Sequence, residues 1–273
     1  MSRYLRLLRG VLLDEHYLEN ELRIAHLLAA ATTGAPVDGQ RLADPARYMT
    51  KAYAARERRS QTGELPASAE SAVSHLALAD IGRARLDHLE ACVTAIASDD
   101  VTGDLVDCGS ERPGAAIYLS GLREELALTE RDFWVSGLFM GSDSLTADGA
   151  IRPSADLNAT RQAFARFDLL DGVRFLQGPA SETLAGAPVA EVALLRLDGH
   201  DPAELEAALE ALYDRVSEGG FVVIDDYGDT ECRQAVDAFR AAGGIAEPMG
   251  WVDAGAAAWR KGERAVRSRT GPA

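Results

Sequence analysis

The feature that most constrains the fold is a regular alternation of short apolar runs and amphipathic segments over most of the chain. Five runs are strand candidates, at residues 103–109, 132–137, 173–178, 191–199 and 219–228. Segments of helical periodicity follow or separate them, at 114–126, 154–170, 202–216 and 229–242, and two short strands are expected near 245–249 and 256–260. This alternation predicts an α/β fold with a doubly wound, mostly parallel sheet covered by helices on both faces.

The N-terminal third has a different pattern. Leucines at near-helical spacing predict one amphipathic helix over residues 1–30, packed either on the main domain or on a second subunit. Residues 31–72 are rich in Gly, Pro, Thr and charge, which is typical of a disordered segment or a functional lid. A long helix is expected from about residue 74 to 97. We therefore divide the chain into a helix and lid region (1–73), a main domain (74–261) and a flexible tail (262–273).

Composition excludes several classes of protein. The 273 residues include 28 Lys and Arg and 43 Asp and Glu, for a net charge of −15, which disfavours nucleic acid and anionic membranes as partners. Three widely spaced cysteines without a CxxC pair argue against zinc and disulfide frameworks and favour a cytoplasmic protein. We expect no signal peptide, because charges interrupt the N-terminal apolar run, and no stretch reaches the roughly 18 apolar residues of a membrane span.

The ends of the predicted strands carry the candidate site, because parallel sheets bind ligands at the carboxyl ends of their strands. Asp198 ends the fourth strand, and Asp225 and Asp226 end the fifth. Two carboxylates ~4 Å apart repel by about 4 kcal/mol at an effective dielectric constant of ~20. A hard cation such as Mg²⁺, Mn²⁺ or Ca²⁺ would relieve that repulsion. The alternative is that one or two of these residues only cap the following helices. His200 is either a loop residue or a further ligand.

The first strand and its turn read GDLVDCGSERPG, with Asp107 at the strand end and Gly109 and Gly114 in the turn. An acid at this place can receive an ammonium group or a ribose hydroxyl. The glycines let a ligand approach the backbone, and the N-terminus of the next helix favours anions. The segment is not GxGxxG, so it indicates only that a nucleotide-type site is possible.

With these segments in view, the chain resembles the macrocin O-methyltransferase (TylF-like) family from RYLRLLRGVL to WRK. The resemblance is densest in GDLVDCG, FARFDLLDGVRFLQG, LLRLDG, RVSEGGFVVIDDYG and ECRQAVDAFR. It implies a class I methyltransferase fold and Mg²⁺-dependent transfer of a methyl group from S-adenosylmethionine to a sugar or polyol hydroxyl in natural-product biosynthesis. By the same resemblance Asp198, Asp225 and Asp226 are the metal ligands, Asp198 is the general base, and the protein is a homodimer.

The cofactor half of the pattern departs from the family. The family's ETGVWRGG is replaced by the residues from Asp107 to Gly114, which places Asp107 and Gly109 at the cofactor. Gly137 stands where the family has an aspartate that holds the cofactor ribose, and Ala79 and Asp80 replace a Thr-Met pair. Asp80 and Asp143 are nearby acids that could compensate.

Two main hypotheses stay open. One is an O-methyltransferase with a rewired cofactor pocket and a hydroxylated small-molecule substrate. The other is a methyltransferase fold that no longer uses S-adenosylmethionine and catalyses a different metal-dependent reaction, such as cyclisation, elimination or hydrolysis. A non-catalytic partner subunit is a third reading, which clustered carboxylates disfavour because idle like charges destabilise a fold.

Overall fold

The computed structural model describes residues 2–54, 77–79, 81–109, 112–139, 144–145, 151–152, 156–199 and 201–262. Within these residues a seven-stranded sheet has the order β5-β2-β1-β6-β7-β9-β8. Its strands are β1 (Asp104–Cys108), β2 (Phe133–Gly137), β5 (Val173–Gln177), β6 (Val192–Leu197), β7 (Val216–Ile224), β8 (Gly250–Trp251) and β9 (Ala257–Arg260). The first five are parallel, and β9 pairs antiparallel with β7 and β8. The predicted fold class is confirmed.

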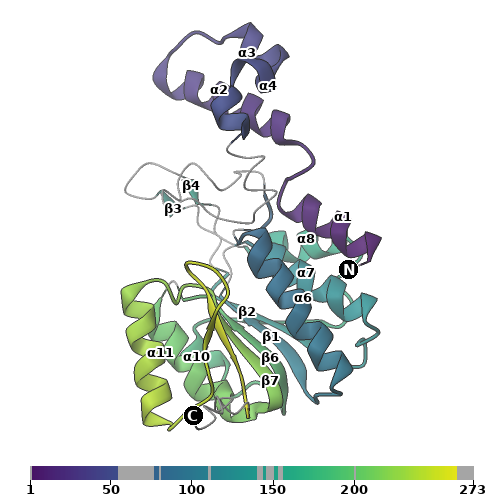
Figure 1. Ribbon diagram of the computed structural model, residues 1–273, viewed down its shortest axis with the longest axis vertical. Coiled ribbons are helices and arrows are strands. Elements are labelled where there is room, and N and C mark those ends of the chain that lie inside the picture. Colours follow the sequence, from purple (N-terminus) through teal and green to yellow (C-terminus); the bar gives the residue numbers. More distant parts are fainter. Residues whose placement is uncertain are drawn as a thin grey trace, which may run out of the picture.

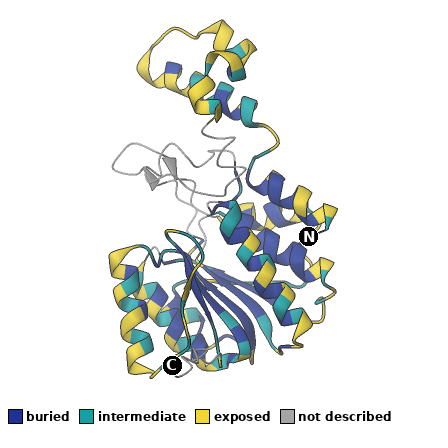
Figure 2. Cartoon of the chain, in the orientation of Figure 1, coloured by how far each residue is buried: buried dark blue, intermediate teal, exposed yellow. Residues whose placement is uncertain are grey.

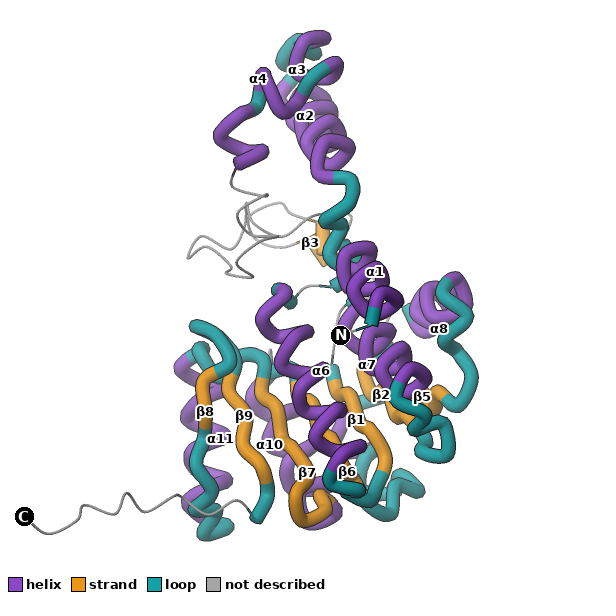
Figure 3. The backbone as a smooth tube through the Cα atoms, turned by 45° about the vertical axis from the view of Figure 1, so that its right-hand side comes forward, coloured by secondary structure: helices purple, strands orange, loops and turns teal. Residues whose placement is uncertain are grey.

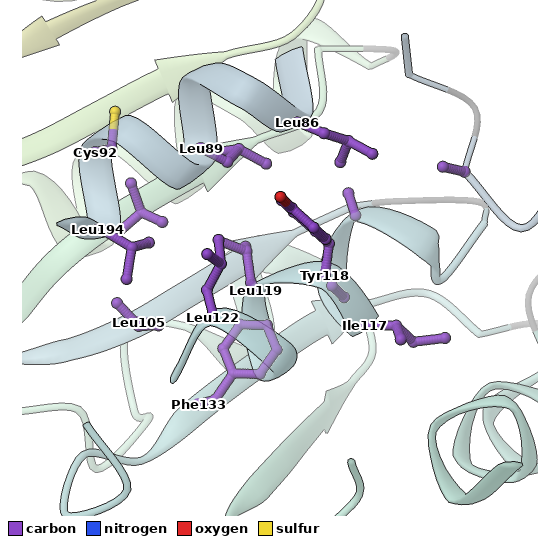
Figure 4. Packing of buried hydrophobic residues seen from close by; sticks show 14 of the residues in the cluster. Leu86, Leu89, Cys92, Leu105, Ile117, Tyr118, Leu119, Leu122, Phe133 and Leu194 are labelled. Carbon is purple, nitrogen blue, oxygen red and sulfur yellow. The ribbon is translucent and has the colours of Figure 1, made fainter. Parts of the chain in front are cut away.

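Helices cover both faces of the sheet, as Figure 1 shows. One face carries α6 (Arg83–Ser98), α7 (Gly114–Glu125) and α8 (Leu157–Arg166); the other carries α9 (Ala180–Thr183), α10 (Pro202–Leu212), the 3-10 turn η2 (Tyr213–Arg215) and α11 (Thr230–Ala242). Each face has its own apolar core, and Figure 4 shows the one beneath α6 and α7. We call this side of the sheet the α6/α7 face.

Strand β6 illustrates why the strands read as continuous apolar runs. From Leu194 onward its side chains alternate between the two cores: Leu194 packs on the α6/α7 face, and Leu195 and Leu197 pack on the other. All six residues of the strand are buried, so both faces require apolar side chains. Arg196 is the exception, and its partners define the candidate site described below.

The N-terminal region differs from the single predicted helix. It forms α1 (Arg3–Leu12) and α2 (Leu18–Thr33), separated by a turn in which Asp14 has a φ of 55°. A left-handed residue ends an α-helix, so the prediction of one helix over residues 1–30 is wrong. Three leucines of α1, Leu5, Leu8 and Leu12, join the core of the α6/α7 face. Helix α1 thus packs on the main domain, one of the two arrangements expected.

Helices α2, α3 (Gly39–Ala43) and α4 (Pro45–Tyr48) stand apart from the sheet at the top of Figure 1. Most of their surface is exposed (Figure 2). Residues 31–54 are therefore not simply a loop: the side chains of Asp38 and Asp44 cap α3 and α4 by accepting backbone N–H bonds. Residues 55–72 of the expected lid, and 263–273 of the expected tail, lie outside the described residues.

Two boundaries also differ from the sequence prediction. Helix α6 begins at Arg83, not near residue 74. Residues 77–79 instead form tertiary backbone bonds: Ala79 N–H donates to Leu12 O at 3.0 Å, and Gly114 N–H donates to Leu78 O at 2.8 Å. The strand expected at 245–249 lies at 250–251 as β8, which forms the edge of the sheet (Figure 3).

A short hairpin of β3 (Ser144–Leu145) and β4 (Ile151–Arg152) was not predicted.

No helix among the described residues is long and apolar enough to cross a bilayer.

Candidate active site

The candidate site lies at the carboxyl edge, which we define as the side of the sheet where its parallel strands end. The backbone continues the parallel ladder one residue beyond each strand. Gly109 N–H donates to Ser136 O at 2.8 Å, Asp198 N–H to Cys108 O at 2.9 Å, and Asp225 N–H to Leu197 O at 2.9 Å. The structure therefore brings the ends of β2, β1, β6 and β7 side by side, with the predicted residues on them.

Two glycines let the backbone pack closely at this edge. Gly109 has a φ of +98°, and a Cβ there would lie 3.1 Å from Cβ of Asp198. A Cβ on Gly199 would lie 3.0 Å from Cβ of Asp226 and 2.4 Å from Sγ of Cys232. The segment after β1 thus contacts the segment after β6. The segment after β6 also contacts the segment after β7. Gly109 is needed both for its left-handed backbone and for this contact.

A buried ionic row crosses three strands on the α6/α7 face. Arg196 on β6 lies opposite Asp107 on β1 in the strand register. Its Nη1 donates to Asp107 Oδ1 at 2.5 Å, and its Nη2 donates to Asp225 Oδ2. The three side chains are 0%, 1% and 3% exposed. One guanidinium therefore joins the predicted cofactor acid Asp107 to the predicted metal ligand Asp225.

Burial and pairing act in opposite directions on Asp107. Desolvation raises the pKa of its carboxyl group, and the Arg196 guanidinium opposes that rise by its charge and its hydrogen bond. Among the described residues, Asp107 Oδ2 and Asp225 Oδ1 are buried atoms with no hydrogen-bond partner. Each acid thus has one oxygen held by Arg196 and a second oxygen without a protein donor in the described part of the chain.

Helix α6 carries two basic groups, Arg85 and His88, on whose pKa values the charge of Asp225 acts. Burial lowers the pKa of the Arg85 guanidinium, but the charges of Asp225, Asp253 and Asp226 and a hydrogen bond to Asp253 outweigh burial, and the net pKa is raised. Burial also lowers the pKa of His88, which the charge of Asp225 partly opposes. Arg85 is fixed by Asp253, whose Oδ2 accepts from Arg85 Nε at 2.8 Å.

Asp198 and Asp226 are partly exposed, unlike Asp225. Both raise the pKa of the Cys232 thiol, to about 12, after the larger effect of burial, so both lie near this sulfur. They do not cap the following helices. Asp201 caps α10 by accepting from Ala203 N–H at 2.9 Å, and Asp229 caps α11 by accepting from Glu231 N–H at 2.8 Å. The capping alternative for the three strand-end acids is therefore wrong.

The described residues contain no group of three His, Cys, Asp or Glu side chains close enough together to hold a metal ion. The three predicted ligands thus share an edge without converging on one point in this structure. Their role as a metal set stays a prediction.

Gly137 is the last residue of β2. Its carbonyl oxygen accepts a hydrogen bond from Gly178 N–H at 3.0 Å. A Cβ at this position would meet the ring of Phe139 at 3.5 Å, an ordinary van der Waals contact. The position has room for a larger residue. His200, Asp80 and Asp143 lie outside the described residues.

Sequence reasoning missed Arg196, Arg85 and His88. Arg196 had a signal, because a charged residue inside the apolar run EVALLRLDG must find buried partners. Arg85 and His88 had none, since they lie on an ordinary amphipathic helix and only tertiary packing directs them to Asp225.

Most of the chain matches a known protein family. The family model of macrocin-O-methyltransferases (TylF) matches residues 1–261. The chain belongs to the macrocin O-methyltransferase family. The family resemblance of its sequence segments is thereby confirmed, and so is the methyltransferase class of enzyme.

Two relatives and one solved structure define this similarity. A tetracenomycin 4′-O-methyltransferase from Streptomyces olivaceus, whose name specifies a dimethoxy-rhamnosyl substrate, is 38% identical over 201 residues, covering 69% of this chain and 77% of that protein. Mycinamicin III 3″-O-methyltransferase from Micromonospora griseorubida is 33% identical over 196 residues, covering 66% and 77%. The O-methyltransferase NovP is 27% identical, with a TM-score of 0.71 over 94% of this chain and 98% of that one.

Proposed function

We propose that this macrocin O-methyltransferase family member transfers a methyl group from S-adenosylmethionine to a hydroxyl on the sugar of a natural product, with the help of a divalent cation. The observation that carries the proposal is the meeting of Asp107, Asp198, Asp225 and Asp226 at one carboxyl edge, where other residues serve as helix caps. These strand-end acids do not cap a helix, and they gather at the edge where parallel sheets bind ligands. Both facts favour a ligand-binding role.

The donor atoms suit a hard cation, but in this structure the three candidate ligands do not converge on one point. All three candidate ligands are carboxylates, which suit Mg²⁺, Mn²⁺ or Ca²⁺. Asp225 Oδ1 is buried without a protein hydrogen-bond donor among the described residues, and Asp198 and Asp226 are partly exposed at the same carboxyl edge. Asp198, Asp225 and Asp226 would hold the ion, which when bound lowers the pKa of a neighbouring substrate hydroxyl.

The chain's own groups can perform the remaining tasks. Asp198 is partly exposed and its backbone N–H is bonded to Cys108 O, so we assign it the role of accepting the substrate proton. Transfer of a methyl group needs the oxygen, the methyl carbon and the leaving sulfur in line. The rigid strand ends serve this geometry by fixing the groups that orient both substrates.

The cofactor would lie over β1 and β2. Asp107 Oδ2 would be the acceptor for a cofactor N–H or O–H donor, and the turn at Gly109 would border the cofactor. Gly137 offers no side chain to the ribose. Hydrogen bonds to a charged group contribute about 1.5–3 kcal/mol each. We therefore expect weaker cofactor binding than an aspartate at this position would give.

The relatives support a sugar acceptor, since the tetracenomycin enzyme is named for a rhamnosyl substrate. The rim of the site has a matching surface. The ring of Trp251, 56% exposed, lies 5.1 Å from the ring of Tyr227, which follows Asp226 in the chain. Tyr227 is buried, so the exposed ring of Trp251 is the one that would receive the apolar part of a glycosylated acceptor.

The test is calorimetric titration of S-adenosylmethionine and S-adenosylhomocysteine into the purified protein, with and without Mg²⁺. We expect micromolar binding of both. No binding at millimolar ligand would support the second hypothesis, in which a methyltransferase fold is used for another reaction. The absence of a ribose-binding side chain at Gly137 favours that hypothesis.

Matched variants separate the acids by role. Asp225→Asn should abolish Mg²⁺ binding, measured by the same calorimetry, while the fold stays intact by circular dichroism. Asp229→Asn makes the same chemical change four residues away, at a helix cap, and should leave Mg²⁺ binding unchanged. Equal Mg²⁺ affinity in both variants would refute the metal assignment.

A further inference from the structure

Trp251 lies at the carboxyl edge, although its strand β8 is the outermost strand of the sheet. Its register partner is Ala257 of β9, which pairs with Ile224, the last residue of β7. Trp251 is 56% exposed, whereas the two other tryptophans, Trp134 and Trp259, are buried. A single exposed aromatic residue is common on protein surfaces. Trp251 differs because its neighbours fix its position at the candidate site.

Two side chains support the ring of Trp251. The centre of the Tyr227 ring lies 5.1 Å from the centre of the indole, and the guanidinium carbon of Arg233 lies 5.9 Å from it. Both supports are themselves held. Tyr227 Oη donates to Asp237 Oδ1 at 2.8 Å, and Arg233 Nη2 donates to Gly228 O at 3.0 Å. A supported indole that stays exposed elsewhere offers a surface to the apolar face of a ligand ring.

This support adjoins the acids that the proposed function assigns to the acceptor. Arg233 follows Cys232 in α11. A Cβ on Gly199, the residue after Asp198, would lie 2.4 Å from Sγ of Cys232 and 3.0 Å from Cβ of Asp226. The segments that carry the two acids therefore pack against the helix that carries Arg233.

The loop between β8 and β9 is held by the carboxylate of Asp253. Its Oδ1 accepts from the backbone N–H groups of Gly255 and Ala256, both at 2.8 Å. Its Oδ2 accepts from Arg85 Nε on α6, also at 2.8 Å. The N–H of Gly228 donates to Gly255 O at 2.7 Å and fastens the same loop to the segment after β7. One side chain thus both shapes the loop that follows Trp251 and ties it to a helix.

The Arg85–Asp253 pair is anchored at the acid edge. Burial raises the pKa of Asp253, but the hydrogen bond and charge of Arg85 and two backbone N–H groups outweigh burial, so the net pKa is lowered. Arg85 is itself buried and lies in the field of Asp225 and Asp226 as well. Asp225 is held in turn by Arg196. The loop is therefore tied by charge to the strand ends that carry the candidate site.

We propose that Trp251 is a specificity-determining residue on which the sugar ring of the acceptor stacks. We propose further that Asp253 is a positioning residue, which fixes the β8–β9 loop through Arg85 and so holds Trp251 at the acid edge. The inference rests on the proposed function, because its ligand is the sugar-bearing acceptor. It requires no cation at Asp225.

The first experiment tests the stacking. Methyl α-L-rhamnopyranoside, a sugar of the type in the name of the tetracenomycin relative, is titrated in the presence of S-adenosylhomocysteine and followed by saturation-transfer NMR. Trp251→Ala should raise the dissociation constant about three- to tenfold, whereas Trp251→Phe keeps an aromatic surface and should stay within about twofold. Tyr17→Ala is the matched control. Tyr17 is 61% exposed just before α2, and its variant should bind as the wild type does.

The second experiment tests the positioning. An asparagine at 253 keeps an oxygen for the loop's N–H groups but loses the charge that binds Arg85. Asp253→Asn should therefore loosen the loop, increase acrylamide quenching of the tryptophan fluorescence and weaken rhamnoside binding about threefold, with unchanged affinity for S-adenosylhomocysteine. Asp132→Asn is the control, because Asp132 pairs with Arg174 Nε at 3.3 Å just before β2, at the opposite edge of the sheet.

The outcomes separate the two proposals. Wild-type protein that bound no S-adenosylhomocysteine would refute the proposed function and this inference with it. Protein that bound S-adenosylhomocysteine but no rhamnoside up to about 100 mM would overturn the inference alone. Wild-type rhamnoside affinity in Trp251→Ala would do the same. Unchanged quenching and rhamnoside affinity in Asp253→Asn would overturn the positioning role. Should Asp253→Asn fail to fold, the exposed position 251 still decides, because its substitution removes no buried contact of the core.

Discussion

At the scale of single residues, the site is built from a few side chains whose partners lie on neighbouring strands. Asp107, Arg196 and Asp225 are far apart in the sequence and touch only because β1, β6 and β7 are adjacent. Gly137, on the next strand, has no side chain to add to this set. A Cβ there would lie 3.5 Å from the ring of Phe139, an ordinary van der Waals contact, so the first atom of a side chain fits.

This space makes Gly137→Asp a direct test of the cofactor pose. The new Cβ would make only an ordinary van der Waals contact with Phe139, and the carboxylate would stand at the position of the family's ribose-binding aspartate. One or two charged hydrogen bonds at about 1.5–3 kcal/mol each would tighten S-adenosylhomocysteine at least tenfold in calorimetry. Gly137→Ala fills the same space without a charge and should bind the ligand as the wild type does. Equal affinities in the two variants would show that the cofactor lies elsewhere.

At the scale of elements, the two N-terminal helices have different roles. Leu8 of α1 is 5% exposed and belongs to the main core, whereas Leu28 of α2 is 53% exposed. The same leucine-rich pattern thus produces one docked helix and one helix that stands clear of the sheet (Figure 1).

The pair gives a matched stability experiment. Leu8→Ala should lower the free energy of unfolding by about 2–5 kcal/mol, because it leaves a cavity between α1 and α7. Leu28→Ala should change it by less than about 0.5 kcal/mol, as expected of an exposed position. Urea denaturation followed by circular dichroism measures both. A comparable loss in Leu28→Ala would mean that α2 is covered in solution.

At the scale of the whole molecule, the three cysteines lie on different elements and all are buried: Cys92 on α6, Cys108 on β1 and Cys232 on α11. Burial raises the pKa of the Cys92 and Cys232 thiols to about 12 and that of Cys108 further still. At pH 8 almost none of each thiol is thiolate, which is the reactive form.

We therefore expect a disulfide reagent such as DTNB to label none of the three cysteines in the native protein at pH 8. All three should react once the chain unfolds in guanidinium. The rate of labelling at intermediate denaturant should follow the loss of circular dichroism signal. Rapid labelling of one cysteine in the native state would show that its part of the core opens locally.

The sequence determined the sheet, its helical layers and the position of each acid at a strand end, because hydrophobic periodicity and strand length are local properties. It did not determine where α6 begins, because Ala79 and Gly114 form backbone bonds to distant residues. Nor did it show the break at Asp14, which depends on a single left-handed residue.

Only the tertiary structure decided how the acids are used. Whether Asp198 or Asp201 caps α10 depends on where the helix starts, and periodicity gives such a boundary only approximately. That Arg196 lies between Asp107 and Asp225 depends on the order and register of β1, β6 and β7. Strand order is a relation between distant segments, so residue spacing along the chain determines the ends of the strands, and packing determines which side chains meet there.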